Sequence, residues 1–106
     1  MAVISVPGEA SWFAARWAFT ELLDRTRRVL ASDADLRATI DAAEANDGLH
    51  LGRLEPAQAE RVTAAVREAA RQLADEVPAD SPDPRRLSFR EELRRLDRLL
   101  EGGRPG

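Results

Sequence analysis

The clearest hydrophobic pattern in the chain covers residues 56–77 and repeats at the spacing of an α-helix. Pro56 has the fixed backbone angle that suits the first position of a helix. Small or branched apolar residues then recur every three or four positions and share one face; they are Ala59, Val62, Val66, Ala69, Leu73 and Val77. We therefore predict a helix over 56–77 whose small side chains let a neighbouring helix approach closely.

Two further helices are predicted before this one. Residues 11–30 carry an apolar stripe at helical spacing, and Ser11 is a suitable N-cap. The stripe consists of Trp12, Ala15, Phe19, Leu22, Leu23, Thr26, Val29 and Leu30. Residues 32–35 read as a helix cap with acidic first-turn residues, so a second helix should follow them and run to about Asn46, where Asn46, Asp47 and Gly48 have C-cap chemistry.

The C-terminal part of the chain is predicted to be a separate helix on a linker. Residues 78–87 contain three prolines, which forbid a continuous helix. Ser88 and Glu91 match a capping box, so we expect a helix over 88–101. Its apolar stripe consists of Phe89, Leu93, Leu96 and Leu100. The glycines that follow end this helix, and residues 102–106 should form a flexible tail.

Two short segments favour β-strands. Residues 2–6 are rich in β-branched side chains, and within 49–54 Leu49 and Leu51 alternate around His50. Because a lone strand is not stable, these two segments should pair as a minor two-stranded element. The predicted fold is mainly α: a small antiparallel bundle with three core helices in residues 1–77, the linker, and a C-terminal amphipathic helix.

Four of the five aromatic residues lie within eight positions, which is more than one helix face can bury. On a helical wheel Trp12 and Phe19 face the predicted core, whereas Phe13 and Trp17 lie together on another side among polar residues. The segment 2–6 or the helix after the linker could cover this second pair. Alternatively, Phe13 and Trp17 are exposed and anchor a partner, because aromatic residues dominate binding hot spots.

Charge is distributed unevenly, although the chain as a whole carries only −3. Residues 1–84 hold nine arginines and fifteen acids, whereas residues 85–106 hold seven arginines and four acids. Arg86, Arg90 and Arg94 are therefore candidate anion-binding residues on the last helix. Acids interrupt this basic region, and the acidic remainder would repel phosphate, so nucleic acid is the less favoured partner.

Few residues in the chain could support catalysis or bind a metal ion. There is no cysteine, and His50 is the only histidine, expected as an ordinary surface residue. We therefore expect no enzyme activity, no metal site and no cofactor; a small-molecule site would need a cavity beside Trp12 or Trp17. No apolar run reaches the roughly 18 residues that span a bilayer. The start of the chain lacks the features of a secretion signal, so we expect no membrane partner and a cytoplasmic location.

The sequence therefore favours a non-catalytic protein–protein interaction module, either an adaptor or an antitoxin- or immunity-type inhibitor. Its partner would be another protein chain or a second copy in a homodimer. Binding would use Phe13 and Trp17. If the last helix pairs with another chain instead of docking on the bundle of its own chain, binding would use Leu93, Leu96 and Leu100. The alternative is a nucleic-acid-associated regulator that uses the arginine-rich C-terminal helix.

Overall fold

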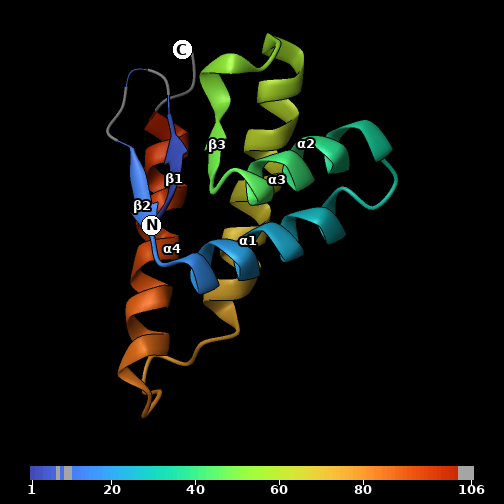
Figure 1. The fold of residues 1–106 in the computed structure, drawn as a ribbon. Helices are drawn as coiled ribbons and strands as arrows, with labels where there is room; N and C mark the ends of the chain where they lie inside the picture. Colours follow the sequence, from blue (N-terminus) through green and yellow to red (C-terminus); the bar gives the residue numbers. More distant parts are fainter. Residues whose placement is uncertain (7, 9–10, 103–106) are drawn as a thin grey trace.

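The computed structural model describes residues 1–6, 8 and 11–102 and shows a mainly helical chain with a small sheet (Figure 1). Along these residues the order is β1 (Ala2–Ser5), β2 (Trp12–Ala14), α1 (Arg16–Val29), α2 (Ala34–Ala45), β3 (Gly48–His50), the 3₁₀ turn Leu51–Arg53, α3 (Pro56–Asp75) and α4 (Pro84–Gly102). The mainly helical fold is confirmed. The antiparallel bundle stays a prediction.

The sheet has three strands in the order β2-β1-β3, so the predicted two-stranded element is wrong in its number of strands. The two predicted segments do pair with each other: β1 runs parallel to β3, with Ile4 opposite Leu49. The additional strand, β2, runs antiparallel to β1 and places Phe13 opposite Val3. The rest of the predicted segment 49–54 leaves the sheet in the 3₁₀ turn.

The prediction that the first helix begins after Ser11 is wrong. Trp12, Phe13 and Ala14 are in turn buried, exposed and buried, which is the alternation of a strand. Ala15 keeps an extended backbone, with φ −60° and ψ 150°, and α1 starts only after it. A helical wheel and a strand both turn Trp12 inward, so the sequence pattern alone does not separate them.

The second helix begins within the predicted capping segment 32–35, and the proline predicted at the start of the third helix is confirmed. The Asp33 side chain accepts a hydrogen bond from the Leu36 backbone N–H at 3.0 Å, as an N-cap should. Pro56 is the first residue of α3. Asp47, just after α2, has a φ of +53°, and β3 begins at the next residue.

The last helix begins at Pro84, four residues before the predicted start at Ser88. Asp83 caps it: its carboxylate accepts from the Arg85 N–H at 2.9 Å, and its carbonyl accepts from the Leu87 N–H at 3.1 Å. Proline is tolerated there because the first N–H of a helix has no intrahelical partner. The capping-box pattern at Ser88 therefore lies inside the helix. Except for Gly102, the predicted tail lies outside the described residues.

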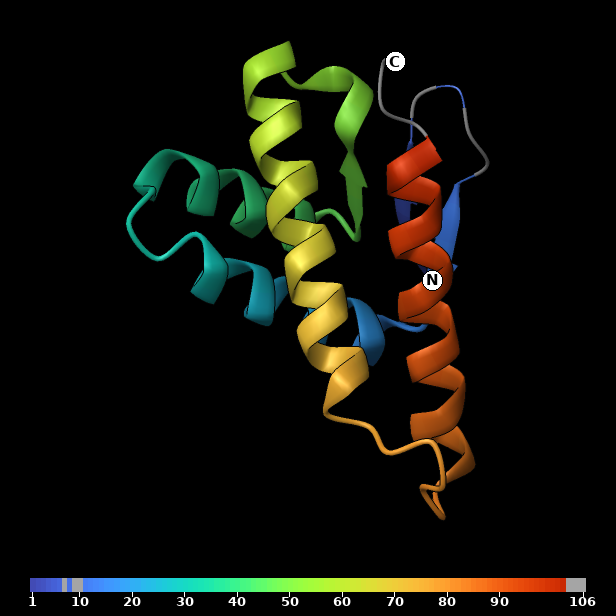
Figure 2. The same cartoon turned by 180° about the vertical axis from the view of Figure 1, so that it is seen from behind.

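The core forms where α3 packs against both α1 and α4, and where one face of the sheet packs toward α4 (Figures 1 and 2). The strands contribute Ala2, Ile4, Trp12, Ala14 and Leu49 to this core. The Trp12 indole N–H donates to the Glu92 carbonyl on α4 at 3.0 Å, which ties β2 to that helix. The last helix thus docks on its own chain.

Candidate protein-interaction surface

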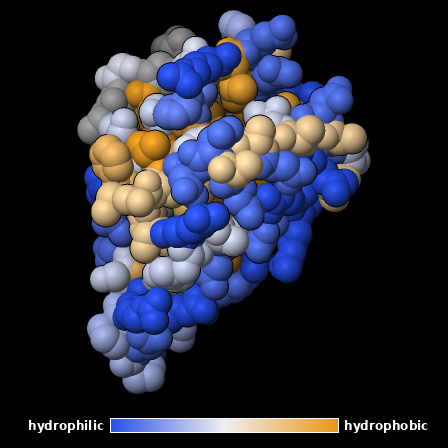
Figure 3. Space-filling view, viewed as in Figure 1, coloured by the Kyte–Doolittle hydropathy of each residue, from blue (hydrophilic) through white to orange (hydrophobic). Residues whose placement is uncertain are grey.

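The face of the sheet that points away from the core carries an aromatic side chain in contact with solvent. Val3 and Phe13 lie opposite each other on β1 and β2, on the side away from their buried neighbours Ile4 and Trp12. Phe13 is 53% exposed and Met1 is 90% exposed. Hydrophobic side chains gather on the surface where Figure 1 places β1 and β2 (Figure 3).

A hydrogen-bonded pair lies beside Val3 on the same face. Ser5 and His50 are opposite each other in the β1–β3 register, and the Ser5 Oγ is 2.9 Å from the His50 Nδ1. A Cβ at position 48 would lie 3.0 Å from the His50 Nε2 and 3.4 Å from the Val3 Cγ1. The imidazole therefore lies across Gly48 toward Val3. We call Met1, Val3, Ser5, Phe13 and His50 the outer sheet face.

The Ser5–His50 pair could not be predicted from the sequence. The two residues are 45 positions apart, and no local pattern indicates the strand register that brings them together. A serine next to a histidine is also the start of a nucleophile–base pair. A working pair further needs a group that orients the histidine. Among the described residues no carboxylate is hydrogen-bonded to His50. The pair therefore carries no argument for catalysis.

Two opposite charges border the outer sheet face at the end where β1 begins. Asp47 precedes β3, and its carbonyl accepts from the Val3 N–H at 3.1 Å. The Arg16 Nε lies 3.6 Å from the Asp47 Oδ1, which is too far for a hydrogen bond. The side chains of Arg16 and Asp47 are 73% and 42% exposed. The Asp47 Oδ1 is buried and has no hydrogen-bond partner among the described residues, so the Arg16 guanidinium and the exposed part of the Asp47 carboxylate are what another charged group could reach.

Trp17 does not share a helix face with Phe13, because Phe13 lies on β2 and Trp17 on α1. The Trp17 ring packs against Phe89 of α4, with 5.1 Å between centroids and an angle of 55°. The guanidinium of Arg85 lies 5.1 Å from the centroid of the Trp17 ring, a cation–π distance. The helix after the linker therefore partly covers Trp17, whereas Phe13 stays exposed.

The predicted partner-binding leucines of the last helix lie within the chain's own core. Leu93, Leu96 and Leu100 are at most 1% exposed. They pack where α4 meets α3 and the sheet, so in this fold they form no exposed surface. Their burial reflects the same apolar stripe that predicted the helix.

The candidate anion-binding arginines are largely engaged with acids. Arg86 donates to both carboxylate oxygens of Glu21, at 3.0 and 3.3 Å. Arg90 lies 3.6 Å from the Glu91 carboxylate, and its buried Nε has no hydrogen-bond partner among the described residues. Arg94 is exposed. The three arginines therefore do not offer three free cations for phosphate.

Asp97 on α4 is also engaged in ion pairs within the fold. Asp97 accepts hydrogen bonds from Arg67 at 2.8 Å and from Arg71 at 3.2 Å, both on α3. Burial alone would raise the pKa of Asp97, but the two hydrogen bonds outweigh it and hold that pKa below its ordinary value. The carboxylate is thus charged and joins α4 to α3.

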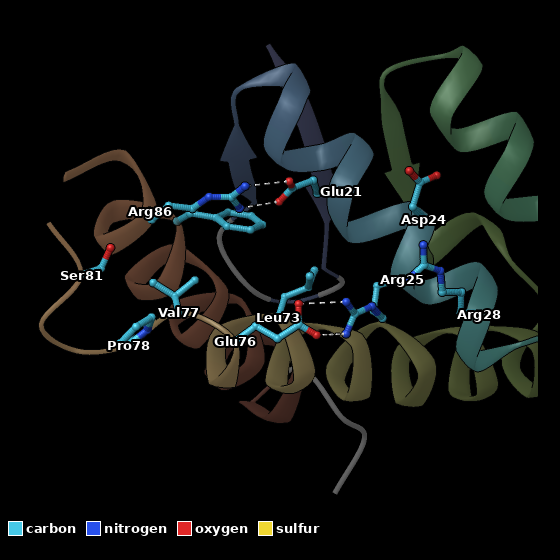
Figure 4. A pocket seen from close by; sticks show the side chains of 11 residues that line it. Glu21, Asp24, Arg25, Arg28, Leu73, Glu76, Val77, Pro78, Ser81 and Arg86 are labelled. Atoms are coloured by element: carbon cyan, nitrogen blue, oxygen red, sulfur yellow. Dashed lines mark hydrogen bonds and ion pairs between the residues drawn. The ribbon is translucent and has the colours of Figure 1, made fainter. Parts of the chain in front are cut away.

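The main pocket lies between α1, the end of α3 and the start of α4, and has a volume of about 530 Å³ (Figure 4). Two ion pairs cross it: Arg86 binds Glu21, and Arg25 donates to Glu76 at 2.5 and 3.0 Å. The hydrogen bond from Arg25 lowers the pKa of Glu76. The lining holds three arginines and three acids, so it selects neither anions nor cations; they are Arg25, Arg28, Arg86, Glu21, Asp24 and Glu76.

Comparison with known proteins gives no match: no family model, no curated protein and no solved structure is similar to this chain. Within the described residues, no group of three or more histidine, cysteine or acidic side chains is placed to hold a metal ion. No helix in that part of the chain is both long and apolar enough to cross a bilayer.

Proposed function

We propose that this chain is a non-catalytic protein–protein interaction module, of the adaptor or inhibitor type, that binds its partner through the outer sheet face. The carrying observation is the exposure of Phe13, 53%, directly opposite Val3. Fully burying a phenylalanine side chain is worth about 1.5–3 kcal/mol. A partner that covers Phe13 therefore gains a favourable contribution that the chain alone leaves unused.

The surroundings of Phe13 support a protein partner. Val3 and the imidazole of His50 extend the surface sideways, and Arg16 and Asp47 provide charges at its border. An aromatic residue at the centre with polar groups at the rim is typical of interaction hot spots. The alternative, a nucleic-acid-associated regulator, receives less support because Arg86 and Arg90 are already close to carboxylates.

The proposal can be tested by placing a photo-crosslinking phenylalanine analogue at position 13 in the full chain, in cells of the source organism. Val29 is a matched control site, because it is 36% exposed and lies at the end of α1, outside the outer sheet face. We expect a saturable crosslinked protein band at position 13 and none at position 29. Excess wild-type chain should compete the band away, whereas chain carrying Val3→Asp should not.

Val3→Asp should leave the helical circular dichroism signal in place, because Val3 is outside the core. Equal labelling at positions 13 and 29 would contradict the proposal, because it would show no preference for the outer sheet face. Competition by the Val3→Asp chain as effective as that by the wild type would contradict it in the same way.

A further inference from the structure

We infer that the partner of the outer sheet face is a second copy of this chain, so that the protein forms a two-fold symmetric dimer. This inference rests on the proposed function and names the occupant of its surface. Three features of the chain support it: the charges at the border of the face, its apolar centre and the charge of the remaining surface.

The border charges are complementary to themselves. In a two-fold dimer the same patch of each copy forms the interface. If one residue of the first copy contacts a different residue of the second, the reverse contact is also made. A patch bordered by one cation and one anion can therefore place Arg16 of each copy beside Asp47 of the other. The two side chains are exposed, and within one chain they approach only to 3.6 Å, without a hydrogen bond. A partner copy could pair with the exposed Arg16 guanidinium and with the exposed part of the Asp47 carboxylate, although the buried Asp47 Oδ1 stays out of its reach.

The centre of the patch suits sheet-to-sheet packing. Phe13 and Val3 form one row across β2 and β1, and the imidazole of His50 lies beside Val3 in the space above Gly48. Two such faces can stack with their side chains interleaved, as packed sheets do at a spacing of about 10 Å. Phe13 of each copy would then lose the solvent contact that it keeps in the single chain.

The charge of the chain allows self-association at this patch. The net charge is −3, so two copies repel each other weakly overall. One arginine and one aspartate border the outer sheet face, so their charges cancel there. Because the apolar patch is small, the dimer should be weak and reversible, in the range of transient interfaces.

The first test is sedimentation equilibrium of the purified full chain. We expect a reversible monomer–dimer equilibrium at protein concentrations on the order of 100 µM. Phe13→Asp should raise the dimer dissociation constant by at least about 30-fold, and the matched control Val29→Asp by less than about twofold. A wild-type chain that stays monomeric at about 1 mM would overturn the inference.

The second test uses the border charges. Arg16→Glu gives a patch with two anions and Asp47→Lys gives one with two cations, so each variant should dimerise more weakly than the wild type. An equimolar mixture should form a heterodimer, since opposite patches then meet. Because Asp47 has a φ of +53°, Asp47→Asn, which adopts that conformation readily, replaces Asp47→Lys if the latter fails to fold. An equimolar mixture of the Asp47→Asn and Arg16→Glu chains should still dimerise more strongly than the Arg16→Glu chain alone.

The mixing result separates this inference from the proposed function. A mixture no more associated than its components would overturn the dimer. If position 13 still crosslinks to a different protein, the interaction module stands and only its partner was wrongly named. If the dimer is absent and position 13 shows no preferential crosslink, both proposals fail.

Discussion

The two faces of the small sheet use the same strands for opposite purposes. On the inner face, Trp12 and Ile4 are fully buried, and Trp12 also donates a hydrogen bond to α4. On the outer face, Phe13 follows Trp12 directly in the chain and is 53% exposed. Two adjacent aromatic residues of similar hydrophobicity therefore differ in role because a strand alternates its sides. Composition alone does not distinguish a core residue from an interface residue here.

The largest effect is expected on the inner face. Trp12→Ala removes a fully buried ring and its hydrogen bond to the Glu92 carbonyl, and should lower the free energy of unfolding by about 3–5 kcal/mol. Urea denaturation measures this change. Trp12→Phe keeps most of the ring and should cost less. A loss below about 1 kcal/mol for Trp12→Ala would show that the inner face is not a packed core.

A smaller effect is expected where α4, which supports the inner face, is held to α3. Asp97→Asn weakens the hydrogen bonds from Arg67 and Arg71 and should cost about 1–3 kcal/mol at neutral pH. Because the folded pKa of Asp97 is lowered, the unfolded state binds more protons, so this stability is lost as pH falls below about 4. Thermal melting from neutral to acidic pH should show a shallower pH dependence for Asp97→Asn than for the wild type. Equal slopes would contradict this role.

On the outer face, the imidazole of His50 should oppose any side chain at position 48. Gly48→Ala places a methyl group 3.0 Å from the His50 Nε2, and we expect a cost of about 0.5–1 kcal/mol. In a His50→Ala background this cost should vanish or become a gain, because the unfolded chain has fewer accessible conformations with alanine than with glycine and therefore loses less entropy on folding. A double-mutant cycle of unfolding free energies measures the coupling. A cycle without coupling would show that the ring does not fill this space.

The smallest effect on stability is expected at Phe13. Phe13→Ser removes a side chain that is half in solvent, so the unfolding free energy should change by no more than about 0.5 kcal/mol. The measurement needs a protein concentration at which the chain is monomeric. The contrast with Trp12→Ala then gives the difference between the faces directly. A loss above about 2 kcal/mol would make Phe13 a core residue and remove the basis of the interaction surface.

The elements that sequence analysis predicted well are those whose signals are local. The capping segment 32–35 before α2, the proline at the start of α3 and the leucine stripe of α4 all act within one or two helical turns. The start of α4 was misplaced because Ser88 offers a capping pattern, whereas Asp83 and Pro84 supply the actual cap. Competing local signals four or five residues apart are not resolved without the contacts of the folded chain.

The candidate surface was predicted only in part. Exposure of Phe13 was one of two open alternatives, and it rested on a helical wheel that does not apply, since Phe13 lies on β2. Ser5, Arg16 and Asp47 were not recognised, because their neighbours in space come from distant parts of the chain. The hydrogen bond between Ser5 and His50 spans 45 positions, and only the parallel register of β1 and β3 creates it. Long-range strand pairing leaves no periodic pattern in a single sequence.

The position of β1 in the middle of the sheet has a consequence for how the chain is made. Its antiparallel neighbour β2 follows within a few residues, but its parallel neighbour β3 is translated only after both α1 and α2. During synthesis one edge of β1 therefore remains unpaired until Gly48–His50 have been translated and have left the ribosome.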